Sequence, residues 1–157
     1  MPFKYTGCSD MSFDGHIQAM EFSSRATYLV IATSVDISIW VTKTWTRCDV
    51  VLKKPSPSAI PTALTWIEDE TVVVGFSDGS LYTFVISLPE SEVCFFLPMS
   101  TRLLFSLVQL LTITAIKCTT ESISHLSYCT VSRTLAVGCV SKVTLWQRSQ
   151  GTAIFIV

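Results

Sequence analysis

The sequence has no excess of charge of either sign. Of its 157 residues, 11 are Lys or Arg and 12 are Asp or Glu, which leaves a formal net charge of −1. Proteins that bind nucleic acid tightly neutralise several phosphates with clustered Lys and Arg side chains, and no such cluster occurs here. The composition therefore argues against nucleic acid as a direct partner.

The sequence also lacks the spacing of cysteine and histidine that holds a metal ion. It contains only two histidines, and no Cys-x-x-Cys pair occurs among its six cysteines, which are Cys8, Cys48, Cys94, Cys118, Cys129 and Cys139. Zinc sites require such pairs or histidines at matching spacing. We therefore predict no metal site, no cofactor and no disulfide framework, and we interpret the cysteines as buried apolar residues in a reducing compartment.

We expect no secretory leader, because no long apolar run follows Lys4 near the start of the sequence. We expect a cytoplasmic or nuclear location. Apolar residues, by contrast, are abundant at 49% of the chain, which suffices for an ordinary hydrophobic core without disulfides or metals.

Aromatic residues recur at a fixed spacing. In three places an aromatic lies 18 positions before another, in the pairs Phe22 and Trp40, Trp66 and Phe84, and Tyr128 and Trp146. A repeated spacing of this kind indicates a repeat protein in which each unit is one small sheet. Because these aromatics hold a fixed place in every unit, we predict that they are packing residues and not ligand-stacking residues.

Each unit reads as a four-stranded antiparallel meander. Runs of β-branched residues such as Tyr28–Thr33 predict second strands, and third strands end on Trp40, Phe84 and Trp146. Polar turns separate the strands, and Asp78 in Ser-Asp-Gly-Ser is predicted to form a turn. Fourth strands are expected at Thr46 to Leu52, Val93 to Phe96 and Thr152 to Val157.

The distance between units is irregular. Phe22 and Trp66 are 44 residues apart, which suits a propeller blade, whereas Trp66 and Tyr128 are 62 apart. The excess falls before Tyr128 in an unusually apolar stretch. We expect the following division: an N-terminal segment 1–13, blade 1 at 14–54, blade 2 at 57–97, an apolar insertion or gene-model artefact at 98–117, and blade 3 at 120–157.

Three interpretations of the apolar stretch stay open. Leu103 to Ile116 carries no charge, but a bilayer core needs about 20 residues, which argues against a membrane helix. In the second interpretation, the stretch packs on the sheet face or covers it as a helix. In the third it is a translated in-frame intron outside the fold.

The three units resemble WD repeats, the tryptophan-aspartate repeats that build β-propellers. The resemblance rests on AMEFSSRATYLVIATSVDISIW, ALTWIEDETVVVGFSDGSLYTF and HLSYCTVSRTLAVGCVSKVTLW. The residue after each closing aromatic is Val41, Val85 or Gln147 and never the family's Asp, and His16 lies too close to the first strand for the family's histidine role. The hydrogen-bonded set of the family is thus incomplete, so stability must depend more on packing.

Taken together, these features predict an all-β fold: a partial β-propeller of three four-stranded antiparallel blades, with an apolar insertion between blades two and three. Propellers close with about four to eight blades, so three sheets leave open ends and favour self-association. The resemblance implies a non-catalytic scaffold that binds other proteins. The alternative is a membrane-associated protein anchored through Leu103 to Ile116.

No catalytic residues are predicted. Cys129 and His125 are close in sequence, but residues four apart on a strand lie about 13 Å from each other, which is too far for one to activate the other. The turn Glu68-Asp69-Glu70 is expected to be solvated. Trp45, flanked by Lys43 and Arg47, falls outside the repeated pattern and is our first choice for a contact with a partner.

Overall fold

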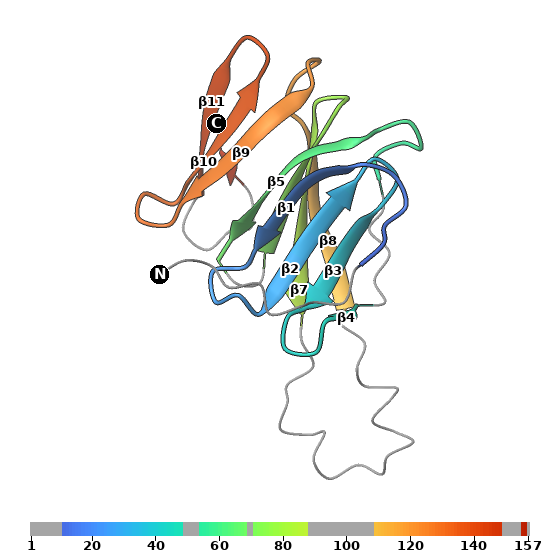
Figure 1. Cartoon of the computed structure of the whole chain (residues 1–157). Helices are drawn as coiled ribbons and strands as arrows, with labels where there is room; N and C mark the ends of the chain where they lie inside the picture. Colours follow the sequence, from blue (N-terminus) through green and yellow to red (C-terminus); the bar gives the residue numbers. More distant parts are fainter. Residues whose placement is uncertain (1–10, 49–53, 69–70, 88–108, 149–154, 157) are drawn as a thin grey trace, which may run out of the picture.

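The computed structural model describes residues 11–48, 54–68, 71–87, 109–148 and 155–156 (Figure 1). They form three antiparallel sheets of four strands each, in which every strand pairs with the next along the chain. The first sheet contains β1 (Ile17–Phe22), β2 (Tyr28–Thr33), β3 (Ile37–Val41) and β4 (Thr46–Arg47). The second contains β5 (Pro61–Ile67), β6 (Thr71–Phe76), β7 (Ser80–Ser87) and β8 (Gln109–Lys117). The third contains β9 (Ile123–Cys129), β10 (Thr134–Cys139), β11 (Val143–Arg148) and β12 (Phe155–Ile156). The predicted all-β fold with three antiparallel meanders is thus confirmed.

The fourth strand of the second sheet comes from an unexpected part of the chain. It is β8, which pairs with β7 from Ser87↔Gln109 to Ser80↔Lys117, whereas the predicted strand at Val93 to Phe96 lies outside the described residues. The range 98–117, expected as an insertion, therefore contributes its last nine residues to a blade. Its β-branched run from Thr112 to Thr114 explains the preference for a strand over a helix.

The turns between the first and second strands share one backbone feature. Ala26, Glu68 and Arg133 have positive φ angles of 54°, 61° and 52°. A left-handed residue lets the chain reverse within a few positions, although non-glycine residues adopt it at some cost. Glu68 and Arg133 fall in the segments predicted as turns, and Ala26 directly follows the predicted turn Ser23-Ser24-Arg25.

The repeated aromatics define two faces of each sheet. We call the face that carries them the leading face and the opposite one the trailing face. The leading faces carry Phe22 and Trp40 in the first sheet, Trp66 and Phe84 in the second, and Tyr128 and Trp146 in the third. In every sheet the two aromatics pair with the same residue of the second strand, on either side of it.

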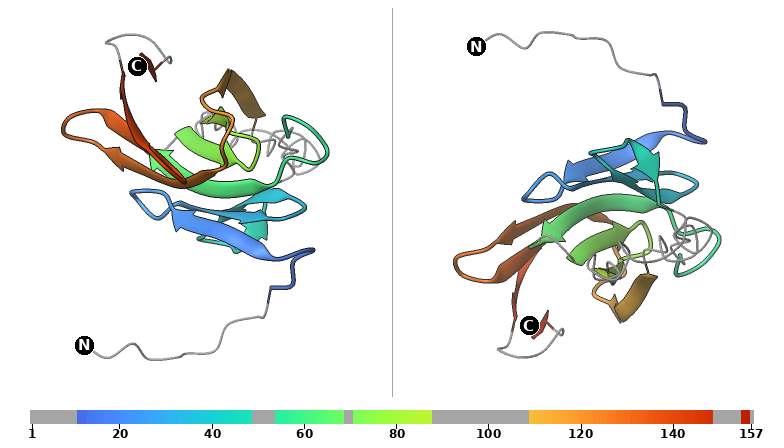
Figure 2. Two further views of the ribbon diagram at one scale, coloured as in Figure 1. Left: turned by 90° about the horizontal axis from the view of Figure 1, so that it is seen from above. Right: turned by 90° about the horizontal axis from the view of Figure 1, so that it is seen from below.

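The sheets stack in one sense, with the second sheet between the other two (Figure 2). The leading face of the second sheet packs on the trailing face of the first, and the leading face of the third packs on the trailing face of the second. The inner strands β1, β5 and β9 lie side by side in the stack (Figure 1). This arrangement is that of a partial propeller.

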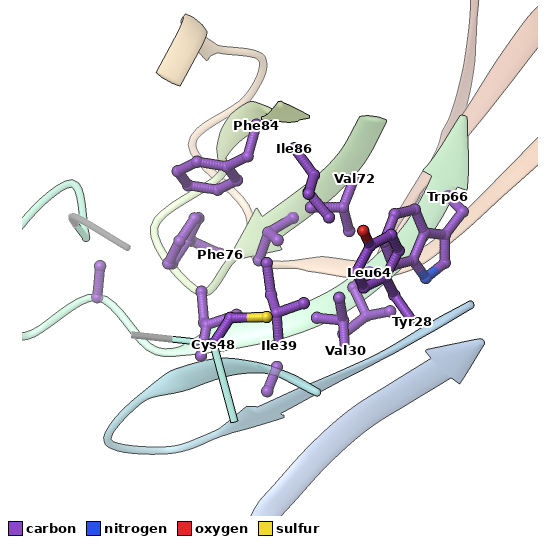
Figure 3. Close-up of a cluster of buried hydrophobic side chains, with 14 residues drawn as sticks. Tyr28, Val30, Ile39, Cys48, Leu64, Trp66, Val72, Phe76, Phe84 and Ile86 are labelled. Carbon is purple, nitrogen blue, oxygen red and sulfur yellow. The ribbon is translucent and has the colours of Figure 1, made fainter. Parts of the chain in front are cut away.

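The first core lies between sheets one and two. Figure 3 shows Tyr28, Val30 and Ile39 of the first sheet meeting Trp66 and Phe84 of the second. The Trp66 ring stacks on Tyr28 with 6.2 Å between centroids and 19° between planes. Its indole N–H also donates to the Glu21 carbonyl at 3.0 Å, so one side chain both fills the core and ties β5 to β1.

A bulge in each first strand shapes these contacts. The pairing skips one residue after Ile17, Pro61 and Ile123. Without the skip, the alternation of a strand would put these residues on the trailing face, since they lie five positions before the first aromatic. The bulge turns them onto the leading face, where Ile123 is fully buried in the second core.

Ile123 packs into a gap that only glycine leaves. A Cβ at Gly75 of β6 would lie 2.5 Å from the Ile123 Cγ2 atom and 2.9 Å from its Cβ atom. Next to this contact, the Thr62 hydroxyl donates to the Gly75 carbonyl at 3.2 Å and also to the Ile123 carbonyl. We call the contact between two packed sheets a seam. The seam between sheets two and three therefore combines a protruding side chain, Ile123 (the knob), the gap at Gly75 that receives it (the hole) and the hydrogen bond from Thr62.

Substituting Gly75→Ala should lower the free energy of unfolding by about 1–3 kcal/mol, because the new methyl group overpacks the contact with Ile123. Urea unfolding of the variant measures this loss. In an Ile123→Ala background the same change should cost less, since the Cγ2 atom is gone. Equal costs in both backgrounds would show that this contact does not limit the packing of the seam.

Substituting Tyr128→Phe should raise the free energy of unfolding by about 1 kcal/mol. The Tyr128 hydroxyl is buried and has no hydrogen-bond partner in the part of the chain that the structure describes, and an unsatisfied buried hydroxyl is costly. Thermal unfolding monitored by circular dichroism tests this. A clear loss of stability would instead reveal a partner for the hydroxyl.

Candidate interaction surface

The predicted repeat aromatics divide into buried and accessible residues. Trp66, Phe84 and Trp146 are buried between sheets, with 6%, 0% and 6% of their surface exposed, and Tyr128 is half-buried. No sheet among the described residues packs on the leading face of the first sheet, where Phe22 is 50% exposed and Trp40 is half-buried. The same position in the repeat therefore contributes to the core in two sheets and to an open surface in the first.

Each tryptophan of a third strand forms a local hydrogen bond. The Trp40 indole donates to the Ser38 hydroxyl at 3.1 Å, and the Trp146 indole donates to the Thr144 hydroxyl at 3.0 Å. Both partners lie two residues earlier on the same face of the strand. This local hydrogen bond satisfies the indole N–H without the larger hydrogen-bonded set that is incomplete in this sequence. The His16 backbone N–H donates a hydrogen bond to the Ser34 hydroxyl at 3.1 Å.

An open cleft of about 640 Å³ lies on the first sheet around Trp40. Its walls come from the segment before β1, the turn between β2 and β3, and strands β3 and β4; the lining residues are Ser12, Phe13, Asp14, Thr33, Val35, Asp36, Ser38, Trp40 and Arg47. Phe13 meets Trp40 edge to face, with ring centroids 5.8 Å apart and planes at 77°. The cleft thus combines two aromatic rings with hydroxyl and charged groups.

An ion pair lies in the wall of this cleft. Arg47 on β4 contacts the Asp36 carboxylate, and both side chains are about half exposed at 49% and 41%. The carboxylate also accepts a hydrogen bond from the Ile37 N–H at 2.8 Å, which closes the turn before β3. The exposed pair contributes little to stability, but it offers both a donor and an acceptor to a binding partner.

Trp45 lies in the four-residue turn between β3 and β4. Its N–H donates to the Val41 carbonyl at 2.8 Å, and the Thr44 and Thr46 hydroxyls are 2.7 Å apart. The residue has a φ of 54° and is 48% exposed. A tryptophan rarely takes this left-handed conformation, which costs roughly 1–3 kcal/mol at functional sites where it occurs. Arg47, two residues later, connects this turn to the cleft.

Asp78 forms the turn between β6 and β7. Its carboxylate accepts hydrogen bonds from the Ser80 N–H at 3.0 Å and the Ser80 hydroxyl at 2.9 Å, and Lys117 lies 3.6 Å away. Partial burial raises the pKa of Asp78, but these donors and the Lys117 ammonium outweigh it and hold the pKa below its usual value. The neighbouring Gly79 has a φ of 82°, as the turn requires.

The cysteines do not share one environment. Cys48 is buried and Cys118 and Cys139 are partly buried, but Cys129 is exposed, so the interpretation of all six as buried is wrong for that residue. Cys8 and Cys94 lie outside the described residues. Cys129 sits at the end of β9, where its side chain turns to solvent on the trailing face.

The described ranges contain neither a cluster of metal ligands nor a helix that could cross a membrane. No three His, Cys, Asp or Glu side chains come together there as metal ligands would. Among the same residues, no helix has the length and hydropathy needed to cross a bilayer.

Comparison with known proteins gives a structural likeness without a sequence match. No family model and no curated protein matches the sequence. A chain in the crystal structure of a mitotic checkpoint complex superposes with a TM-score of 0.65 at 11% identity over 99% of this chain. A chain of the computationally designed Ika8 protein superposes with a TM-score of 0.57 at 17% identity over 86% of this chain. This chain spans 43% and 35% of their lengths, respectively. Identities this low show the fold alone.

Trp45 stays a predicted contact residue, and the sequence did not predict the cleft beside it. Phe13, Asp36 and Arg47 come from three separate segments, and none of them belongs to the repeated pattern. The one available signal is the Asp of SVDISIW directly before a third strand, which caps the turn in the structure. Nothing in the sequence indicates that Phe13 reaches Trp40.

Alkylation should modify Cys129 before Cys118. Hydrogen bonds from Ser132 and the Val131 backbone lower the pKa of Cys129, whereas burial raises the pKa of Cys118 to about 11. The thiolate is the reactive form, so Cys129 should react at a lower pH than Cys118. Peptide mass spectrometry after iodoacetamide treatment across a pH series measures the order. Equal rates below pH 9 would contradict these environments.

Proposed function

We propose that this chain is a non-catalytic protein–protein interaction scaffold of the WD-repeat propeller type, and that its three sheets form part of a larger propeller. It binds another protein through Trp45 and the cleft beside it. The observation that carries the proposal is the exposed indole of Trp45, held in a left-handed conformation that costs free energy. Strained and exposed aromatics are typical of contact sites, and tryptophan is enriched among the residues that dominate binding energy.

The chemistry of the cleft suits a protein partner. The rings of Phe13 and Trp40 offer apolar contact area, and the Asp36–Arg47 pair offers polar contacts at the wall. This combination of an aromatic centre and a polar border is that of protein interfaces.

The residues of the cleft do not suggest catalysis. It contains hydroxyls and carboxylates but neither a cysteine nor a histidine to act as nucleophile or base. His125 and Cys129 lie on one face of β9, but the His125 Nδ1 atom is hydrogen-bonded to the Ser124 hydroxyl at 3.0 Å. The non-catalytic assignment remains part of the proposal.

The alternative function, membrane anchoring through Leu103 to Ile116, loses support from the fold. Residues 109–116 of that segment belong to β8 and pair along the edge of the second sheet. A helix across the whole segment is incompatible with this strand.

Substituting Trp45→Gly should weaken partner binding while leaving the fold intact. Glycine adopts the left-handed conformation freely, so the variant should not be less stable. Loss of a tryptophan at the centre of an interface costs about 2 kcal/mol or more, which corresponds to a roughly thirtyfold loss of affinity. Affinity capture from cell lysate with quantitative mass spectrometry compares the variant with the wild type.

The matched control is Val131→Gly, which removes a 94% exposed side chain from a turn of the third sheet. A protein that is captured by the wild type and by this control, and lost with Trp45→Gly, supports the proposal. Capture of the same proteins by all three would remove Trp45 from the interaction.

A further inference from the structure

Among the described sheets, the two outermost faces of the stack have no neighbouring sheet and carry exposed apolar side chains. On the leading face of the first sheet, Ile17, Met20 and Phe22 are 51%, 65% and 50% exposed. On the trailing face of the third sheet, Val143 and Leu145 are 67% and 64% exposed. Apolar surface gathered in this way marks an interaction site more often than scattered residues do.

These two faces are the two halves of an interface that the chain already forms twice. Both internal seams join a leading face to a trailing face. Val143 and Leu145 lie three and one positions before the third-strand tryptophan of their sheet, as Ile37 and Ile39 do in the first sheet. Ile37 and Ile39 are buried against the second sheet, with 1% and 2% exposed. The trailing face of the third sheet thus presents the same apolar positions without a neighbour.

The knob and the hole of the internal seam also recur at the two ends. Ile17 follows the pattern of Ile123, because it lies five residues before the first aromatic and directly before the bulge. Gly138 on β10 corresponds to Gly75. A Cβ added at Gly138 would lie 3.3 Å from the Cβ atom of its strand partner His125, and its three nearest atoms all belong to that residue. One end therefore carries an exposed knob and the other an unfilled hole.

The hydrogen bond of the seam has its counterpart too. The Ser124 hydroxyl occupies the bulge position of β9, as Thr62 does in β5, and donates to the Gly138 carbonyl at 3.2 Å. Thr62 makes the same bond to Gly75 and additionally reaches the Ile123 carbonyl of the next sheet. Ser124 is placed to reach the carbonyl of an incoming knob residue.

We propose that the partner of these faces is a second copy of this chain, joined head to tail. The leading face of the first sheet in each copy packs on the trailing face of the third sheet in the other, with Ile17 in the hole at Gly138. Two copies make six sheets, a number within the range of closed propellers, and closure satisfies both ends of both copies. The leading face of the first sheet carries Arg47 beside Trp40, and the strand positions on the trailing face of the third sheet carry no Asp, Glu, Lys or Arg, so no like charges oppose the contact.

This assembly shares part of one face with the proposed binding site. Trp40 lies on the leading face of the first sheet, and its counterparts Phe84 and Trp146 are buried in the internal seams. A second copy packed on this face would therefore cover the Trp40 side of the cleft, so self-association and partner binding draw on overlapping surface.

Analytical ultracentrifugation of the purified chain should give twice the monomer mass of 17.4 kDa. Ile17→Asp and Leu145→Asp should each shift the mass to that of the monomer, since each charge falls in both copies of the seam. Val131→Asp is the control, because it adds the same charge at a residue that is 94% exposed and away from both faces. Circular dichroism should show the same sheet content in all four proteins.

Mixing the two monomeric variants discriminates a head-to-tail contact from a symmetric one. The Ile17→Asp variant keeps an intact trailing face and the Leu145→Asp variant an intact leading face, so the mixture should form a one-to-one dimer. A monomeric wild type would overturn the proposal, as would a Leu145→Asp variant that stays dimeric. A folded pair of variants that does not combine on mixing would overturn it equally.

Discussion

The structure depends on the burial of each sheet's leading face against the trailing face of the sheet before it. A four-stranded meander of this size cannot bury both its faces alone, and a small isolated sheet is only marginally stable. The contact is tight because a bulge turns Ile123 toward β6 and because Gly75 leaves room for it. Packing at this seam therefore provides stability that a larger network of polar side chains would otherwise supply.

The same constraint separates the inner and outer parts of the molecule. Contacts between sheets concentrate at β1, β5 and β9, where backbones approach closely and hydrogen bonds from Trp66 and Thr62 cross the seams. Away from these strands, the outer edge of the first sheet keeps a cleft and a strained turn with an exposed tryptophan. A packed centre thus positions the turns of the rim, the arrangement that lets a repeat fold carry binding residues on loops.

The repeat of aromatics at 18 residues predicted the fold class and the third strands, because core positions impose a period on the sequence. It did not predict local register: the first aromatics of sheets one and three pair with Leu29 and Leu135, seven positions later, whereas Trp66 pairs with Val72, six positions later. The turn before β6 is shorter and the turn after it is longer by the same amount. The spacing between the two aromatics therefore does not reveal the shift in strand pairing. Likewise, β8 and the cleft were missed because both depend on contacts between segments far apart in sequence.

Hydrogen exchange of the native protein tests most directly whether face-to-face stacking governs stability. The second sheet is the only described sheet with neighbours on both faces, and Val72, Val73 and Val74 of β6 are fully buried. The account predicts that β6 amides exchange last and open only with global unfolding. Amides of β2 or β10 that outlast those of β6 would contradict the central position of this sheet.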